Sequence, residues 1–513
     1  MKLFRKRFSQ EKTGRLSPWI AAFLAITLFS GALTGCQSQV VSASPPEESP
    51  VPLEPVSVNS ESGTPDATAF PTRPPYQPGE LVDYTAQTGD TLPALALRFN
   101  TSVKEILAAN TFIPASATTL PPGMPMRIPI YYLPFWGTPY HILPDSLFVN
   151  GPAQIGFDTE AFVREHSGWL ASYSSYASGE QRSGAQLIDL IAKNYSVSPR
   201  MLLALVEYQA GGLSQPELPA DKSAYPLGLI DRKHSGFYMQ LGLAANILNN
   251  GYYGWRKGDL TTLELLNGRL ERPDPWQNAA TVAFQYFFSR LLDQDAYNRA
   301  ISPDGFAKVY QDLFGDPWQS DQPHIPGSLE QPALRLPFQP GKVWAFTGGP
   351  HTGWGDGEPL SAIDFAPPTV VGGCTETNEW ATAAADGVIV RSEPATVVID
   401  LDGDGDEHTG WVIYYLHVAT KDRIPQGTVV KAGDPIGHPS CEGGQATGTH
   451  VHIARKYNGE WILADGALPF NLEGWIVHNG PEEYQGTMTR FGHTITACVC
   501  SDYRSQISSQ GEP

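Results

Sequence analysis

The stretch Thr447-Gly448-Thr449-His450-Val451-His452 decides the fold of the C-terminal third of the chain. Residues two positions apart on a β-strand face the same side, so His450 and His452 are expected to project together into one groove. Runs rich in β-branched residues at 387–390, 396–399 and 411–415 precede it, separated by Gly, Pro and Asp. This pattern predicts an antiparallel β domain, which we bound at residues 335–480. Residues 481–513 are then a C-terminal extension.

Three further segments of this domain carry histidine or aspartate. They contain His351, Asp364 and His417. A catalytic zinc needs three nitrogen or oxygen ligands and one open position for water. Two imidazoles and one carboxylate satisfy that need, so the β domain has the residue types of a metal centre.

These segments resemble the lysostaphin-type (LytM-like) zinc metallopeptidases over roughly residues 340–470. The stretches 380–387 (WATAAADG) and 430–437 (VKAGDPIG) add to the resemblance. The resemblance implies that Asp364 and His452 bind Zn²⁺. It also implies that His450 activates the attacking water and that His417 stabilises the developing oxyanion, in an enzyme that cuts peptide bonds of peptidoglycan.

The first metal ligand departs from the family pattern. That ligand normally lies four residues before the aspartate, where this chain has Leu360, and the nearest histidine is His351. We interpret residues 352–359, which are rich in Gly, as a loop insertion that returns His351 to the site. His351 then completes the metal triad. The alternative is a broken metal site in a folded scaffold.

The hydrophobic and capping pattern of residues 81–130 predicts a small folded module. A strand is expected at 83–86, helices at 92–99 and 103–110, and a second strand at 126–129. The stretches 84–92 (YTAQTGDTL), 107–110 (LAAN) and 120–123 (LPPG) resemble the LysM domain. The resemblance implies a βααβ fold that binds glycans containing N-acetylglucosamine, such as those of peptidoglycan. The alternative is a spacer without a ligand.

Residues 150–325 predict a mainly helical domain, with helices at 187–195 and 199–208. The stretches 201–212 and 236–241 resemble the lysozyme-like domain of lytic transglycosylases. Gln209 stands where that family has its general-acid glutamate, and an amide cannot give a proton to a leaving oxygen. On a helix, Glu207 is rotated by about 200° from Gln209 and should point away from that position. We therefore expect no glycosidase activity. The aromatic residues at 252–255 either stack on sugar rings or fill the core.

The N-terminal segment has the pattern of a secretory signal. Basic residues precede an apolar run from 18 to 33, which is shorter than the ~20 residues of a membrane span. The run ends at Leu33-Thr34-Gly35-Cys36, which resembles the lipobox of bacterial lipoproteins. We therefore expect a signal peptide at residues 1–35 and a lipid anchor at Cys36 that holds the protein to the membrane. Residues 36–80, rich in Pro and Ser, are expected to be an extended linker.

Charge and cysteines limit the partners. Residues 1–35 hold six basic residues and one acidic residue, so their removal changes the formal net charge from −19 to −24. Nucleic acid is excluded as a partner, because phosphate binding needs a basic surface.

Cys374, Cys441, Cys498 and Cys500 allow three disulfide pairings. The acidic stretch 400–407 is interpreted as a solvated hairpin, with a calcium loop as the alternative, because a Trp stands at the twelfth position.

The chain is thus expected to be a multidomain α+β protein: an extracytoplasmic, lipid-anchored zinc endopeptidase associated with the cell wall. Its expected partners are the glycan strands and stem peptides of peptidoglycan. The alternative function is a non-catalytic peptidoglycan-binding scaffold or an activator of another wall hydrolase. A glycan-cleaving lysozyme would need Glu207 as its acid.

Overall fold

The computed structural model describes residues 73, 75–369, 371–500 and 502–511. The expected signal peptide, the expected lipidation site Cys36 and the linker up to residue 72 lie outside the described residues. All the described residues fall in one compact unit, residues 68–513. Among the described residues, every helix is too short or too polar to cross a bilayer.

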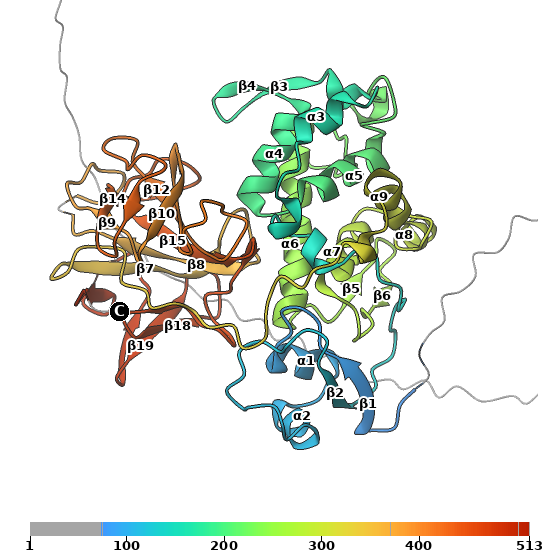
Figure 1. Cartoon of the computed structure of the whole chain (residues 1–513), viewed down its shortest axis with the longest axis horizontal. Coiled ribbons are helices and arrows are strands. Elements are labelled where there is room, and N and C mark those ends of the chain that lie inside the picture. Colours follow the sequence, from blue (N-terminus) through green and yellow to red (C-terminus); the bar gives the residue numbers. More distant parts are fainter. Residues whose placement is uncertain (1–72, 74, 370, 501, 512–513) are drawn as a thin grey trace, which may run out of the picture. The chain divides into compact units, whose positions relative to one another are not determined.

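The first group of elements is a two-stranded antiparallel sheet with two helices between its strands (Figure 1). Its elements are β1 (Glu80–Thr85), α1 (Leu92–Arg98), α2 (Val103–Ala109) and β2 (Pro125–Ile130). The Thr91 side chain caps α1, and Ser102 and Glu105 form a reciprocal capping box at α2. Both helices therefore begin where the sequence predicts them. The first strand begins three residues earlier than expected.

The second group is mainly helical. Ser183 caps α4, while Ser198 caps α5 and Pro199 occupies its first turn. The helices are α3 (Thr159–Arg164), α4 (Gly184–Tyr195), α5 (Pro199–Ala210), α6 (Phe237–Lys257), α7 (Ala279–Ser289), α8 (Gln294–Ala300) and α9 (Phe306–Phe314). Two small hairpins accompany them, β3 (Ser174–Ala177) with β4 (Glu180–Ser183), and β5 (Leu263–Glu264) with β6 (Leu270–Glu271). Short 3₁₀ turns lie at Asp145–Leu147, Pro152–Gln154, Trp169–Ala171, Ala220–Lys222 and Pro317–Gln319.

The aromatic tract of α6 belongs to the core. Tyr252, Tyr253 and Trp255 are all buried, and the Tyr252 ring stacks on Phe148 with centroids 4.4 Å apart. Of the two interpretations of this tract, the structure supports core packing, because rings buried in this way have no free face for a sugar.

The third group is built on one large antiparallel sheet of nine strands. Its strand order is β13 (Val429–Val430), β10 (Gly387–Glu393), β11 (Ala395–Asp400), β12 (Trp411–Val418), β15 (Val451–Tyr457), β8 (Leu360–Ala366), β7 (Val343–Thr352) and β21 (Gln506–Ser508), with β16 (Glu460–Trp461) paired to β15. The three strands expected between 387 and 415 all form. Smaller sheets are β9 (Ala381–Thr382) with β14 (Pro435–Gly437), and β17 (Asn471–Leu472), β18 (Trp475–Asn479), β19 (Gly486–Arg490) and β20 (His493–Thr496).

The two faces of the large sheet are buried against different partners. Ile363, Ile413 and Ile453 belong to the core of the β region. Their neighbours Ala362, Tyr414 and Ala454 belong instead to the cluster that contains the buried residues of α4 to α7. Because side chains alternate along a strand, Asp364 and His452 lie on this second face. The face that carries the candidate site is therefore also the face that contacts the helices.

The segment after residue 480 is part of the β region. β21 pairs with β7 at the end of the large sheet, and β19 pairs with β18. Disulfides link Cys374 to Cys441 and Cys498 to Cys500. The first disulfide joins two loops that are 67 residues apart in sequence.

Candidate metal centre

Asp364 and His452 are direct register partners on neighbouring strands. Asp364 lies on β8 and His452 on β15, and the antiparallel ladder places them opposite each other. Side chains of paired residues lie on the same face of a sheet, with Cβ atoms about 5 Å apart. Both side chains are buried. The ladder alone therefore brings a carboxylate and an imidazole together.

His351 reaches the same place through an irregular pairing. It lies near the end of β7 and pairs with Ala362, and the register shifts on both sides of it. The loop 353–359 then connects β7 to β8. Asn246 and Asn250 of α6 accept hydrogen bonds from the backbone N–H groups of Asp356 and Glu358 in this loop. The irregular pairing and this loop together place His351 on the face that carries Asp364.

The three side chains converge on one point. His351 Nε2 lies 3.0 Å from His452 Nδ1 and 3.2 Å from Asp364 Oδ1, and His452 Nδ1 lies 3.4 Å from the same oxygen. Metal–ligand distances near 2.1 Å in a tetrahedron place ligand atoms about 3.4 Å apart. Asp364 Oδ1 also has no hydrogen-bond partner among the described residues. One carboxylate and two imidazoles at this spacing fit a zinc ion.

Two more histidines lie beside this triad. His450 precedes β15, and its Nε2 lies 3.7 Å from Asp364 Oδ2. The His417 ring lies 4.4 Å from the His450 ring and 6.2 Å from that of His452, measured between centroids. Leu416 pairs with His452, so strict alternation would send His417 to the opposite face. His417 instead has a φ of +63°, a left-handed conformation that turns its ring back to the site.

Backbone carbonyls orient three of the rings. The Nδ1 atoms of His351, His417 and His450 lie 2.8, 2.9 and 2.7 Å from the carbonyl oxygens of Gly349, Glu442 and Gly448. In a neutral ring, Nδ1 then carries the proton and Nε2 keeps its lone pair. His351 thus offers Nε2 to a metal, as second-sphere carbonyls commonly arrange. His417 and His450 offer Nε2 as a base.

Burial and mutual contact shift the pKa values of the site. Burial opposes ionisation of Asp364, but His351 and His450 outweigh it and hold the pKa of Asp364 well below its usual range. Burial, followed by the nearby rings of His450 and His452, lowers the pKa of His417 to about 4. Burial also lowers the pKa of His452. The site therefore presents a carboxylate with neutral imidazoles at His417 and His452 at neutral pH.

Tyr484 was not predicted from the sequence. Its ring lies parallel to that of His351, with centroids 4.2 Å apart. Burial and the negative charge of Asp364 raise its pKa, so it keeps its hydroxyl proton at neutral pH. The residue lies in the turn between β18 and β19, beyond the expected boundary at 480. No motif in the sequence marks it.

The other candidate residues lie away from this centre. Asp400, Asp402 and Asp404 lie close enough together to share a cation, although Asp402 and Asp404 are exposed and the loop's own N–H groups bind their carboxylates. Glu207 Oε2 accepts hydrogen bonds from the N–H groups of Leu213 and Ser214, so it closes the turn after α5. The expected absence of glycosidase activity stays a prediction.

Two family models match consecutive parts of the chain, the first group of elements and the helical group that follows it. The family model described as "LysM domain" matches residues 84–129, and the one described as "LasA, N-terminal domain" matches residues 141–327. The resemblance of residues 150–325 to lysozyme-like domains therefore stays a prediction, because the model that matches this region is a different one.

Curated relatives extend the match into the β region. Protease LasA of Pseudomonas aeruginosa (strain UCBPP-PA14) is 26% identical over 367 residues, which are 68% of this chain and 81% of that protein. Beta-lytic metalloendopeptidase of Lysobacter enzymogenes is 29% identical over 166 residues, or 31% of this chain and 86% of that protein. A solved structure titled as an M23 metalloprotease, pseudoalterin from the deep sea, is 25% identical, covers 33% of this chain and 96% of its own, and has a TM-score of 0.28. Over two thirds of its length, this chain is therefore similar to Protease LasA, and its N-terminal part matches the LysM domain.

Proposed function

We propose that this chain is a zinc endopeptidase that hydrolyses peptide cross-links in peptidoglycan. One observation carries the proposal: His351, Asp364 and His452 come from three strands and place their ligand atoms within 4.8 Å of one another. His417 and His450 lie beside them, each with its Nδ1 held by a backbone carbonyl. The similarity to a protease and to a metalloendopeptidase supports the reaction class.

The chemistry follows from the positions of these side chains. Zinc held by His351, Asp364 and His452 would supply Lewis-acid chemistry, which polarises a carbonyl and makes water a nucleophile at neutral pH. His450 is placed to take the proton of the attacking water, because its Nε2 is unprotonated in the neutral ring. His450 can then give this proton to the leaving amine.

The expected role of His417 at the oxyanion needs a second proton on its ring. In the neutral ring, the Nδ1 proton is donated to the Glu442 carbonyl, and the pKa of about 4 keeps Nε2 unprotonated. Tyr484 carries its own hydroxyl proton next to His351. We therefore assign the role of oxyanion donor to the Tyr484 hydroxyl, while His417 offers an unprotonated Nε2 beside His450.

The rest of the chain would deliver the peptidase to its substrate. The LysM match at residues 84–129 supports binding to the glycan strands of peptidoglycan. A lipid anchor at Cys36 would hold the protein at the outer face of the membrane, with the linker setting its reach. Peptidoglycan thus supplies both the surface that is bound and the peptide bonds that are cut.

Zinc content and turnover of the full chain test this proposal together. We expect one zinc per chain and release of cleaved stem peptides from cross-linked muropeptides, with both lost in His452→Ala. His493→Ala is the matched control, because that histidine is exposed on β20 and lies outside the triad. Absence of both zinc and turnover from the unmodified chain would reject the proposal.

A non-catalytic scaffold is the second candidate, and one observation favours it. The sheet face that carries Asp364 and His452 is shared with the helices, and His351, His417 and His452 are between 2% and 5% exposed. A buried site of this kind is consistent with a metal that holds the fold together. Stoichiometric zinc without turnover on any muropeptide would favour the scaffold.

A further inference from the structure

A cavity of about 180 Å³ lies beside His417 and His450, the two histidines that flank the metal triad. Residues 374–378 and 438–442 line it, together with Ala419, Lys421 and Thr449. This cavity, the loop cavity, is smaller than the ~300–1,000 Å³ of sites for whole small molecules. Its size therefore fits a single side chain of a longer substrate.

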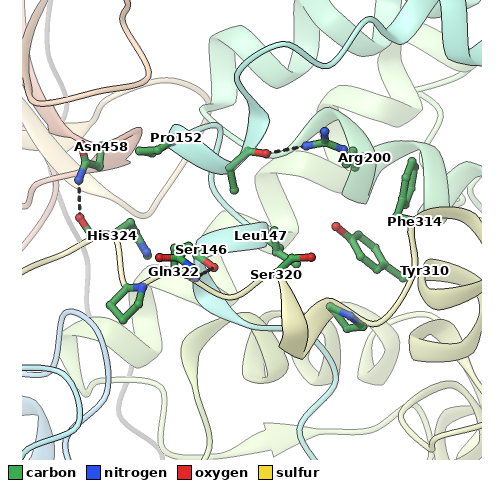
Figure 2. A pocket seen from close by; sticks show the side chains of 13 residues that line it. Ser146, Leu147, Pro152, Arg200, Tyr310, Phe314, Ser320, Gln322, His324 and Asn458 are labelled. Atoms are coloured by element: carbon green, nitrogen blue, oxygen red, sulfur yellow. Dashed lines mark hydrogen bonds between the residues drawn. The ribbon is translucent and has the colours of Figure 1, made fainter.

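A larger cavity, of about 370 Å³, lies in the helical part of the chain (Figure 2). Polar side chains in it bind groups of the chain itself. Arg200 donates to the carbonyl of Ala153 at 2.7 Å, and Asn458 donates to that of His324 at 2.6 Å. Tyr310 is only 2% exposed. These contacts indicate packing between the helices and the β15–β16 turn, so the loop cavity is the better candidate for a ligand.

The wall of the loop cavity is continuous with the residues that position the two histidines. The carbonyl oxygen of Glu442 lies 2.9 Å from His417 Nδ1, and the Ser440 hydroxyl donates to the carbonyl of His417 at 2.9 Å. Ser440 also forms a β-bridge with His450, and Thr449 directly precedes His450. A group bound in the cavity would therefore lie within a residue or two of both histidines.

The walls of the loop cavity are tied to each other. The disulfide between Cys374 and Cys441 joins the two loops. The N–H of Thr375 donates to the Thr449 hydroxyl at 2.9 Å, which fixes the first loop against the segment before β15. A cavity whose walls are held in this way loses little conformational entropy when a ligand enters, and that favours binding.

The lining presents one cation and one anion that are free. Lys421 and Glu376 are both exposed, and neither forms an ion pair or a side-chain hydrogen bond within the described part of the chain. The other carboxylate of the lining, Glu442, accepts hydrogen bonds from the N–H and the hydroxyl of Thr420 at 2.9 and 2.6 Å. Opposite charges attract and like charges repel. A ligand that carries both charges therefore matches this lining better than a ligand that carries one.

We propose that the loop cavity binds an α-amino acid group at the side-chain end of a diamino dicarboxylic acid residue, with its carboxylate on Lys421 and its ammonium on Glu376. The choice of a stem peptide as the source of this residue rests on the proposed function. In a stem peptide that donates its carboxyl end to the cross-link, such a residue keeps both of these groups free. A lysine residue has only the ammonium and would leave Lys421 without a counter-charge.

Turnover of three cross-linked muropeptide dimers tests the proposal. Their donor stems carry meso-diaminopimelic acid, the same residue with its side-chain carboxylate converted to a carboxamide, or lysine. We expect the unmodified chain to have a kcat/KM about fivefold higher for the first dimer than for the other two, the size of an exposed charge pair. Lys421→Gln should remove this preference. Glu376→Gln should lower kcat/KM for all three dimers, because each has the ammonium.

Lys431→Gln is the matched control, because Lys431 is also exposed in the β region but lies outside the loop cavity. It should leave the preference unchanged. Equal kcat/KM for the three dimers in the unmodified chain, or a preference that survives Lys421→Gln, would overturn the proposal. So would Lys421-dependent binding of free meso-diaminopimelic acid together with equal turnover of the dimers, since the cavity would then serve a free amino acid.

Calorimetric titration of Asp364→Asn with the same dimers separates this inference from the peptidase proposal. That variant should lose zinc and turnover but keep its preference for the first dimer, because the loop cavity and the metal triad share no residue. A preference in binding without turnover in the unmodified chain would support the cavity and reject the peptidase. Turnover without any preference would support the peptidase and reject the cavity.

Discussion

The ring of Tyr484 stacks on the ring of His351, with an angle of 18° between the two planes. Tyr484 has a φ of +65°, a left-handed conformation that non-glycine residues adopt only where their surroundings require it. Its N–H donates to the carbonyl of Pro350, the residue before His351. The turn after β18 therefore holds the Tyr484 ring against the candidate metal ligand.

Two substitutions at Tyr484 should separate its ring from its hydroxyl. Tyr484→Ala removes the stack that orients His351 and is expected to weaken zinc binding about tenfold to hundredfold, as loss of outer-sphere support does. Tyr484→Phe keeps the stack, so zinc affinity should be unchanged. Turnover should fall about 10²-fold, because the hydroxyl that donates to the oxyanion is lost. Competition with a chromogenic chelator measures the first effect, and muropeptide release measures the second.

The exposed Tyr503 is the control for this pair of variants. Tyr503→Ala is expected to change neither zinc affinity nor turnover. Equal zinc affinity in Tyr484→Ala, Tyr484→Phe and the unmodified chain would mean that the stack does not orient His351.

A methyl group at residue 348 should disturb the carboxylate of Asp364. Gly348 pairs with Asp364, and a Cβ there would overlap Asp364 Oδ2 and lie 3.0 Å from the Asp364 Cβ. Gly348→Ala must therefore displace the carboxylate, and we expect zinc affinity at least about tenfold lower. Gly372→Ala is the control, because its Cβ would meet no atom within 4 Å. Unaltered zinc binding in Gly348→Ala would show that the carboxylate has room to move.

The β strands and part of the site were predictable from local patterns. His450 and His452 follow the two-residue period of a strand, which is a property of the sequence alone. The helix starts at residues 92 and 103 carry their own capping residues, Thr91 and Ser102, and these also are local signals.

The remaining features depend on contacts that local patterns do not encode. The position of His351 results from register shifts in β7 and from a loop that α6 holds, so the sequence supports only the hypothesis of an insertion. His417 reaches the site through a left-handed backbone conformation that strand alternation does not predict. Tyr484 lies beyond the expected domain boundary, in a turn whose backbone is hydrogen-bonded to Gly349 and Pro350, which are far away in sequence.

The disulfide between Cys374 and Cys441 should stabilise both the fold and the site. It closes a loop with a sequence separation of 67, for which the chain-entropy estimate is about 4 kcal/mol. The carbonyl of Glu442, next to Cys441, orients His417, and the Thr449 N–H donates to the carbonyl of Gly373, next to Cys374. Replacing both cysteines with serine is expected to lower the thermal midpoint and the turnover number together.

Replacement of Cys498 and Cys500 by serine is the matched control for that experiment. These cysteines are only two residues apart, so their disulfide removes little entropy from the unfolded chain. A Cys374 and Cys441 double variant that keeps the thermal midpoint and turnover of the unmodified chain would contradict the role given to this disulfide.

Glu460 should make the stability of the fold depend on acid pH. It is buried on β16, where it pairs with Arg256 at 3.0 Å and accepts hydrogen bonds from Tyr252 at 2.8 Å and His324 at 2.6 Å. Burial opposes its ionisation, but Arg256 and His324 outweigh burial and lower the pKa of Glu460 to about 2. The pKa of an unfolded glutamate is about 4.3. A group whose pKa is lower in the folded state stabilises the fold fully above the unfolded value. That stabilisation, about 3 kcal/mol, is lost as pH falls from about 4.3 towards 2.

Glu460→Gln removes this titration and leaves Arg256 with Asp145 as its remaining buried carboxylate partner. We expect the free energy of unfolding at pH 7 to fall by about 3–5 kcal/mol, as for a broken buried ion pair. The difference from the unmodified chain should narrow between pH 4.3 and 2, because protonation then neutralises Glu460 as well. Urea midpoints measured across this pH range report both effects.

Glu393→Gln is the control, because Glu393 forms a more exposed pair with Lys193; this substitution should lower the free energy of unfolding by about 1 kcal/mol or less. A difference between Glu460→Gln and the unmodified chain that stays constant from pH 7 to pH 2 would mean that Glu460 does not titrate with the fold.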